Sequence, residues 1–259
     1  MLDSFNIAAT GLYAQQLGVD TIANNLANVN SAGYKKSRVH FEDLFYREVL
    51  RGSNQLFVSD SSTVTGGGAG VANVERVFVQ GDLRTTEREL DVAIQGDGFF
   101  EIVLPDGSFA YTRSGSFTLN DRGEMVTLDG HSVNPSVDFP RDVTAIQIAE
   151  DGEVSALLDN SGRPVTLGKL ELARFIDPSS LRPTGNNLYV PSDESGAVIY
   201  GTPGEDGFGG LAQGFIESSN VDLVDELTSL ILAQRAYELS SRVVQVSDEM
   251  MGIINDLPS

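Results

Sequence analysis

Two seven-residue hydrophobic repeats, one near each end of the 259-residue chain, set the strongest limit on how this sequence can fold. The N-terminal repeat consists of Phe5, Leu12, Val19 and Leu26, with Ala8, Ile22 and Val29 three positions after its members. Such spacing places apolar side chains along one side of a helix that packs against another helix. Asp3 or Ser4 can cap this helix, and Gly33 is a natural stop behind it. We therefore expect one helix over residues 3–29.

The C-terminal repeat predicts a second long helix, over residues 220–257. Its line consists of Leu223, Leu230, Tyr237, Val244 and Met251, widened by Leu227 and Ile231. The small residues Ala233, Ser240 and Ser247 lie three positions after members of this line, where they would let a partner helix approach closely. Asn220 is expected to cap the start of the helix. The two terminal helices can pack on each other or on copies of themselves.

The N-terminal helix carries almost no charge. Residues 1–34 contain two charged side chains, Asp3 and Asp20, whereas a surface helix of a soluble monomer usually has a charged outer face. Uncharged polar residues can be buried between protein surfaces if their amides and hydroxyls find partners. This pattern favours a helix surrounded by other helices in an assembly. The alternative is an ordinary helical hairpin with a weakly polar outer face.

Four asparagines stand where the helix meets its connector: Asn24, Asn25, Asn28 and Asn30. An amide can donate to and accept from neighbouring backbones without bringing charge into an interface. We expect this role for the first two, which lie further inside the helix, whereas the last two can equally be ordinary capping and turn residues. Lys35 and Lys36, which follow, are expected to be solvated or to lie at the helix end.

The middle of the chain has a different periodicity. Short alternating segments at 91–104, 115–120, 145–150 and 170–175 read as strands. They are separated by hairpin signals at 104–108, 119–123, 128–130, 150–152 and 159–162. The predicted fold class is therefore α+β, in which long N- and C-terminal heptad helices pack together and flank a predominantly antiparallel β domain. The expected domains are 1–35 with 220–259 (helical) and 36–219 (β-rich), the latter with a polar, glycine-rich mobile loop at about 46–74.

Composition excludes several classes of function. The formal net charge of −20, from 37 acidic and 17 basic residues, argues against a nucleic-acid binder and against adhesion to anionic membranes. The chain has no cysteine, so neither a disulfide framework nor a thiolate metal site can form. No stretch approaches 18 consecutive apolar residues, so no direct membrane span is expected. Asp3 stands where a Sec-type signal would be positive, so any export of the protein is expected to proceed without a cleaved Sec signal.

No motif for catalysis or cofactor binding stands out. The segment "GGGAG" at 66–70 lacks the Gly-Lys-Ser/Thr of a phosphate loop, and "GDGFFE" at 96–101 has Glu101 where a dinucleotide fingerprint needs its third glycine. His40 and His131 are far apart in the sequence and show no metal-ligand spacing. We therefore expect no catalytic residue, no cofactor and no metal site.

Longer segments resemble the flagellar rod and hook axial protein family. These are "NNLANVNSAGYKKSRVHFEDLFY" at 24–46, "GDLRTTERELDVAIQGDGFFEIVLPDGSFAYTRSGSFTLNDRGEMVT" at 81–127, and "SNVDLVDELTSLILAQRAYELSSRVVQVSDEMM" at 219–251. Shorter matches are "TGNNLY" at 184–189 and "GTPGEDGFGGLAQGFIESSNVD" at 201–222. The resemblance covers nearly the whole chain. Tyr34 is a minor departure, because many relatives have phenylalanine there.

The resemblance implies a structural, non-enzymatic protein of the bacterial flagellar basal body. Subunits would leave through the flagellar type III export apparatus and self-assemble helically into the hollow rod that crosses the periplasm, transmits torque and encloses the export channel. Expected partners are further copies of the chain, proximal rod proteins, hook protein and the surrounding ring proteins. The segment "FEDLFY", the length and the residues after 46 favour the distal rod, with a proximal rod subunit as the alternative.

The expected polymerisation surface combines the resemblance with the two repeats. Its residues are Phe5, Leu12, Val19, Ile22, Asn24, Asn25, Leu26, Asn28, Leu223, Leu227, Leu230, Gln234, Tyr237, Val244 and Met251. A second hypothesis, from another class of function, is an enzyme or sugar-binding β domain with a coiled-coil dimerisation element. The uncharged N-terminal helix favours the assembly hypothesis.

Overall fold

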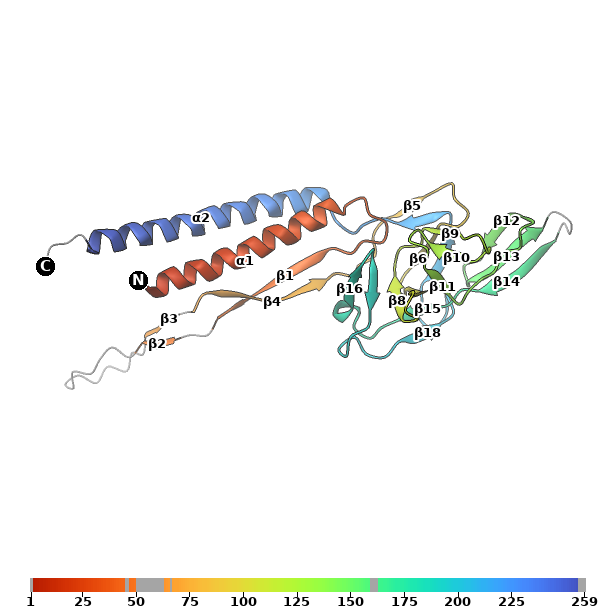
Figure 1. Ribbon diagram of the computed structural model, residues 1–259, viewed down its shortest axis with the longest axis horizontal. Helices are drawn as coiled ribbons and strands as arrows, with labels where there is room; N and C mark the ends of the chain where they lie inside the picture. The colour runs from red at the N-terminus through yellow and green to blue at the C-terminus, as the bar shows by residue number, and fades with distance from the viewer. Residues whose placement is uncertain (1, 45–46, 50–62, 66, 159–162, 256–259) are drawn as a thin grey trace. The chain divides into compact units, whose positions relative to one another are not determined.

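A computed structural model describes residues 2–44, 47–49, 63–65, 67–158 and 163–255 (Figure 1). The described residues form two compact units. The helical unit comprises those within 1–27, 37–75 and 222–259, and the β unit comprises those within 28–36 and 76–221. The chain therefore passes from one unit to the other at four places.

The helical unit is built on two long helices, α1 (Leu2–Ala27) and α2 (Leu223–Asn255). They lie side by side, as the heptad repeats predict (Figure 1). The Asp222 side chain accepts hydrogen bonds from the N–H groups of Val224 and Asp225 and so caps α2. The expectation that Asn220 is this cap is therefore wrong, because its amide is bonded to another part of the chain.

The helical unit also contains two pairs of strands that the sequence analysis did not predict. Strand β1 (Ser37–Asp43) pairs with β4 (Ala69–Arg76), and β2 (Arg47–Val49) pairs with β3 (Thr63–Thr65). The compact units thus group the described residues within 37–75 with the helices, whereas the expected boundaries placed these residues in the β domain. The mobile loop expected at about 46–74 overlaps these strands, and its stretch 50–62 lies outside the described residues.

The β unit contains a seven-stranded antiparallel sheet with the order β16-β17-β8-β7-β11-β10-β9. Its strands are β7 (Phe100–Val103), β8 (Phe109–Thr112), β9 (Phe117–Leu119), β10 (Met125–Thr127), β11 (Ser132–Asn134), β16 (Arg182–Gly185) and β17 (Leu188–Val190). The predicted hairpin signals at 104–108, 119–123 and 128–130 each join neighbouring strands of this sheet. Their glycines Gly107, Gly123 and Gly130 have positive φ angles, which is why turn chemistry located them correctly.

Smaller antiparallel sheets complete the β unit. A three-stranded sheet has the order β12-β13-β14, and three further pairs are β15-β18, β19-β6 and β20-β5. Their bounds are β5 (Leu83–Thr85), β6 (Val92–Gln95), β12 (Val143–Ile148), β13 (Glu153–Leu158), β14 (Pro164–Lys169), β15 (Leu172–Arg174), β18 (Ile199–Gly201), β19 (Gly210–Gln213) and β20 (Phe215–Glu217), with a 3₁₀ turn at Pro178–Ser180. These sheets confirm the predicted antiparallel β middle.

Side chains cover both faces of the seven-stranded sheet. Phe100 and Ile102 point into the larger hydrophobic cluster, which also contains Phe117 and Met125. The alternation of a strand sends residues of intervening positions to the opposite face. There Tyr111 packs with Tyr189, Phe99 and Phe175 in a second, smaller cluster. The β unit thus has a core of its own.

Candidate assembly interface

The predicted N-terminal seam is incompletely buried within one chain. Leu12, Val19, Ile22 and Leu26 are half-buried, and Phe5 is 38% exposed. Of the five described residues that α1 buries, four lie on a different stripe, which consists of Ala14, Gly18, Thr21 and Asn25, and Ala8 alone lies on the predicted seam. These are small or polar residues, whose side chains allow a close neighbour. The seam therefore keeps apolar area that the isolated chain does not cover.

The small-residue stripe of α1 packs against the β1–β4 region. A Cβ atom built on Gly18 would lie 3.5 Å from the ring of Phe41 in β1. At the other end of the stripe, the Asn25 side chain accepts a hydrogen bond from the Ser37 N–H (2.8 Å) and donates one to the Ser37 carbonyl oxygen (2.9 Å). It also donates to the Glu226 carboxylate on α2 (3.3 Å). Asn25 is therefore a buried amide that joins three elements of its own chain.

The other predicted asparagines lie nearer the surface. Asn24 is exposed on α1, and Asn28 accepts a hydrogen bond from the Ser31 hydroxyl in the turn behind the helix. The alternative of an ordinary turn residue therefore describes Asn28. The side-chain amide of Asn25 does bond to a neighbouring backbone, and that backbone belongs to the same chain.

On α2 the predicted residues range from half-buried to exposed. Leu230 and Val244 are half-buried, Gln234 is exposed, and the side chain of Met251 lies outside the described residues. The remaining three are exposed apolar side chains: Leu223 (48%), Leu227 (41%) and Tyr237 (41%). Gln234, Tyr237 and Glu238 of α2 line a groove together with Gln16 and Val19 of α1.

A second apolar line on α2 is more exposed than the predicted one. It consists of Leu232 (66%), Leu239 (62%), Val243 (52%), Val246 (51%), Met250 (47%) and Ile253 (65%). Spacings of seven and four residues place all of them on one face of the helix. The signal was present in the sequence, since residues 232, 239, 246 and 253 form a second heptad line. This second line was not predicted, because the first line already accounted for the packing of α2 on α1.

The connector between α1 and β1 contains Lys35, whose surroundings differ from the expected ones. Lys35 is fully buried, and its Nζ atom lies 2.5 Å from Oε1 of the equally buried Glu217, at the end of β20. Burial lowers the pKa of Lys35, against the attraction of Glu217, which raises it. The expectation of a solvated or helix-end charge is thus wrong for Lys35. Sequence alone could not reveal its partner, which lies 182 positions away.

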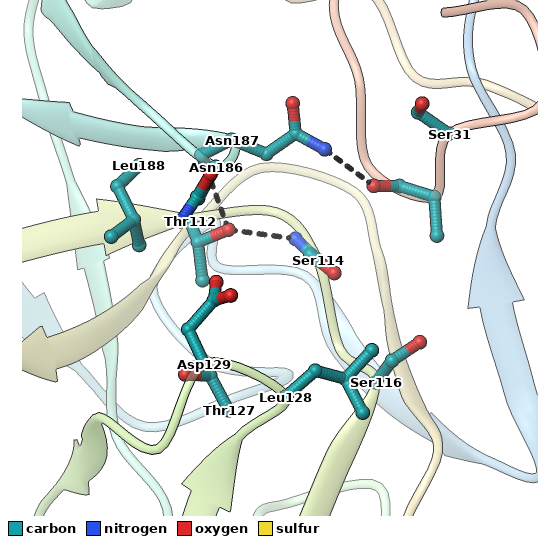
Figure 2. A pocket seen from close by; sticks show the side chains of 11 residues that line it. Ser31, Thr112, Ser114, Ser116, Thr127, Leu128, Asp129, Asn186, Asn187 and Leu188 are labelled. Carbon is teal, nitrogen blue, oxygen red and sulfur yellow. Dashed lines mark hydrogen bonds between the residues drawn. The ribbon is translucent and has the colours of Figure 1, made fainter.

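A polar pocket in the β unit is lined by the 31–32 turn, by the end of β8 and the residues up to 116, by the 127–129 turn and by the β16–β17 turn (Figure 2). The Thr112 hydroxyl donates to the Asn187 carbonyl oxygen (2.9 Å) and accepts from the Ser114 N–H (3.0 Å). The Asn187 side chain donates to the Ala32 carbonyl oxygen (3.0 Å). These groups hold the turn and the hairpin together, so the pocket has a structural explanation.

Among the described residues, no three histidine or acidic side chains gather as a metal ion would require. Glu101 is a buried carboxylate, and it accepts hydrogen bonds from the hydroxyls of Tyr111 (2.9 Å) and Tyr200 (2.5 Å) and from the Asn134 amide. Burial, followed by its hydrogen bond to Glu101, raises the pKa of Tyr200. The cluster links β7, β8, β11 and β18.

No described helix is long and apolar enough to pass through a bilayer.

Comparison with known proteins matches three family models along the chain. Residues 5–35 match the flagella basal body rod protein family, residues 93–156 the flagellar hook protein FlgE/F/G D1 domain, and residues 212–257 the flagellar basal body rod FlgEFG protein C-terminal family. The flagellar basal-body rod protein FlgG of Borreliella burgdorferi is 44% identical over 99% of both chains. The chain belongs to the flagellar basal-body rod protein family. The resemblance noted in the sequence is thereby confirmed.

Other members of the family cover the chain equally well. FlgG of Caulobacter vibrioides is 42% identical over the whole of both chains, and FlgG of Bacillus subtilis is 37% identical over 97% of both. The first family model contains most of α1 with its connector, and the third contains the whole of α2. The rod-family segments at the two ends of the chain are thus the helices that carry incompletely covered apolar lines.

Proposed function

We propose that this rod-family protein is a structural subunit that assembles helically, through α1 and α2, into the hollow distal rod of the flagellar basal body. The observation that carries the proposal is the exposed apolar line of α2, from Leu232 to Ile253. Burying such a side chain contributes about 1.5–3 kcal/mol, and in a polymer this contribution recurs in every subunit. The predicted interface residues of both helices stay part of the proposed surface.

The composition of α1 supports the same assignment. Its outer face carries Tyr13 at 73% exposure together with amides and small residues, and Asp20 is its one charged residue after the first turn. A helix of this kind can enter a protein interior without burying unpaired charge. Neighbouring subunits would then cover α1 and α2, and the β unit would carry the contacts with other basal-body proteins.

Electron microscopy of the concentrated protein tests the proposal. We expect regular hollow tubes that grow with protein concentration and dissolve on dilution. Discrete dimers at every concentration would contradict it and favour the alternative, a β domain with a helical dimerisation element. The proposed non-enzymatic role rests on the family, whose relatives are named as rod proteins.

The place of the subunit within the rod and its route there form a finer part of the proposal. The segment 41–46 and the chain length favour the distal rod over a proximal position. Neighbours would be proximal rod proteins, hook protein and ring proteins, and delivery would use the type III export apparatus. Cross-linking inside isolated basal bodies tests this part. We expect adducts with hook protein, which a proximal subunit would not give.

A further inference from the structure

The chain crosses between the two units at four places. At three of these passages, the adjoining segments of the β unit are hydrogen-bonded to one another. The passages lie between residues 36 and 37, 75 and 76, and 221 and 222. On the β-unit side they are flanked by 33–36, 76–81 and 217–220. These three stretches are distant in sequence, and they belong to neither of the two hydrophobic clusters of the β unit apart from Phe78, at the edge of the smaller one.

Charged side chains supply the first set of links. Lys35 donates to the Glu217 carboxylate and to the Val79 carbonyl oxygen (2.7 Å), so it joins all three stretches. Glu217 also accepts from the Gly81 N–H (2.9 Å) and from Arg113 Nε (3.0 Å). A buried charge is tolerated when it is paired and hydrogen-bonded, as here.

Asn220 supplies the second set. Its side chain accepts from the Lys36 N–H (2.8 Å) and donates to the carbonyl oxygens of Val77 (2.7 Å) and Val79 (3.0 Å). Both ends of the amide are therefore used, each on a different stretch.

Backbone bonds add to these links. The N–H of Asn220 donates to the Tyr34 carbonyl oxygen (3.4 Å), that of Val77 to Lys36 (3.0 Å), and that of Gly33 to Glu217 (2.8 Å). Outside regular sheet pairing, side chains and single backbone bonds thus tie the three stretches to one another.

We propose that Lys35, Glu217 and Asn220 form a connector clamp that makes the three stretches one rigid joint, through which force passes between the helices and the β unit of the assembled protein. This role rests on the proposed function for its mechanical part. The three residues are positioning residues: they fix where the connectors leave the β unit. Without these bonds, each connector would leave the β unit from a stretch that is not fixed to the other two.

Hydrogen exchange in the dilute monomer tests the joint itself. In Lys35→Met, Glu217 keeps Arg113 and the Gly81 N–H, so no charge is left uncompensated and the side-chain volume is kept. We expect the amides of Gly33, Val77 and Asn220 to exchange about tenfold faster or more, because a hydrogen bond to a charged group has been removed. The amides of β7 and β8 should stay as protected as before. Lys169→Met removes a half-exposed lysine and is the matched control.

A second variant keeps the joint testable if Lys35→Met fails to fold. Asn220→Asp keeps the shape of the side chain but sets a carboxylate oxygen against the carbonyl oxygens of Val77 and Val79. We expect the same local acceleration of exchange. Asn186→Asp, at an exposed turn position with φ of +52°, is the control and should change nothing. Unchanged exchange in both clamp variants would overturn the joint, and so would an equal acceleration throughout the β unit.

Bending of assembled tubes tests the transmission of force. We expect tubes of Lys35→Met to form and to show a persistence length, measured on micrographs, at least about twofold shorter than that of the wild type. Equal stiffness would overturn the mechanical role while the exchange result still decides the joint. A wild-type chain that forms no tubes would overturn the mechanical role together with the proposed function.

Discussion

At the scale of single residues, Asn25 and Lys35 show what local patterns reveal and what they conceal. The position of Asn25 deep in an uncharged helix predicted an amide bonded to backbone, and the structure places it on Ser37. Lys35 follows a turn, where a lysine is usually solvated, and yet it is buried against Glu217. The difference is physical: the first inference needs only the composition of the helix, whereas the second depends on a contact made by tertiary folding.

The buried amide of Asn25 gives a testable consequence. Asn25→Ala would leave the N–H and carbonyl groups of Ser37 without their amide partner, which costs about 1–3 kcal/mol when the groups remain buried. We expect the helical signal of the monomer in circular dichroism to melt at a lower temperature. Asn6→Ala, at an exposed position of the same helix, serves as the control and should melt like the wild type. Identical melting of the two variants would show that the Asn25 bonds do not stabilise the helical unit.

At the scale of elements, the sequence predicts best where the signal is local. Both helices were placed to within three residues because heptad spacing and stop residues are read along the chain. Hairpins were located by glycines that adopt positive φ. Strands β2 to β4 were missed because the polar, glycine-rich stretch around them was interpreted as a loop, and β1 was missed because it is paired with a strand about 30 positions further on. The second apolar line of α2 was missed although its spacing is visible.

Close packing of α1 on β1 predicts a difference between two helix glycines. Gly18→Leu should push the Phe41 ring and β1 away, since even a Cβ atom would lie 3.5 Å from that ring. We expect a loss of about 1–3 kcal/mol in the free energy of unfolding of the helical unit, measured by denaturant titration. Gly11→Leu adds the same side chain where a Cβ would meet nothing within 4 Å. That control should not be destabilised, because leucine is the better helix former. Equal losses in both would mean that α1 does not pack on β1 as described.

At the scale of the whole molecule, self-association has to overcome net charge. Every copy carries a formal charge of −20, while the exposed apolar lines of α1 and α2 favour contact. The sequence revealed the charge and the uncovered character of α1. How much apolar surface α2 leaves uncovered depends on which of its faces α1 occupies. Only the structure, and not the sequence, shows which face this is.

Salt should therefore promote assembly. Repulsion between copies is screened beyond roughly 8–10 Å at 0.1–0.15 M ionic strength. We expect faster tube growth at moderate ionic strength than at very low salt, followed by light scattering at a fixed protein concentration. Fastest growth at the lowest salt would show that specific ion pairs between copies control assembly.

The central claim is that the exposed apolar line of α2 becomes buried between copies, and Leu239→Asp tests it most directly. Leu239 is 62% exposed, so the monomer should unfold at the same temperature as the wild type, whereas assembly would have to bury a carboxylate in every repeat. Leu128→Asp makes the same substitution at a leucine that is 68% exposed in the β unit, and serves as the control. The measurement is the fraction of protein that sediments as tubes at a concentration at which the wild type assembles fully. The account predicts that Leu239→Asp stays in the supernatant with an unchanged monomer melting temperature while Leu128→Asp sediments. Sedimentation of Leu239→Asp like the wild type would contradict it.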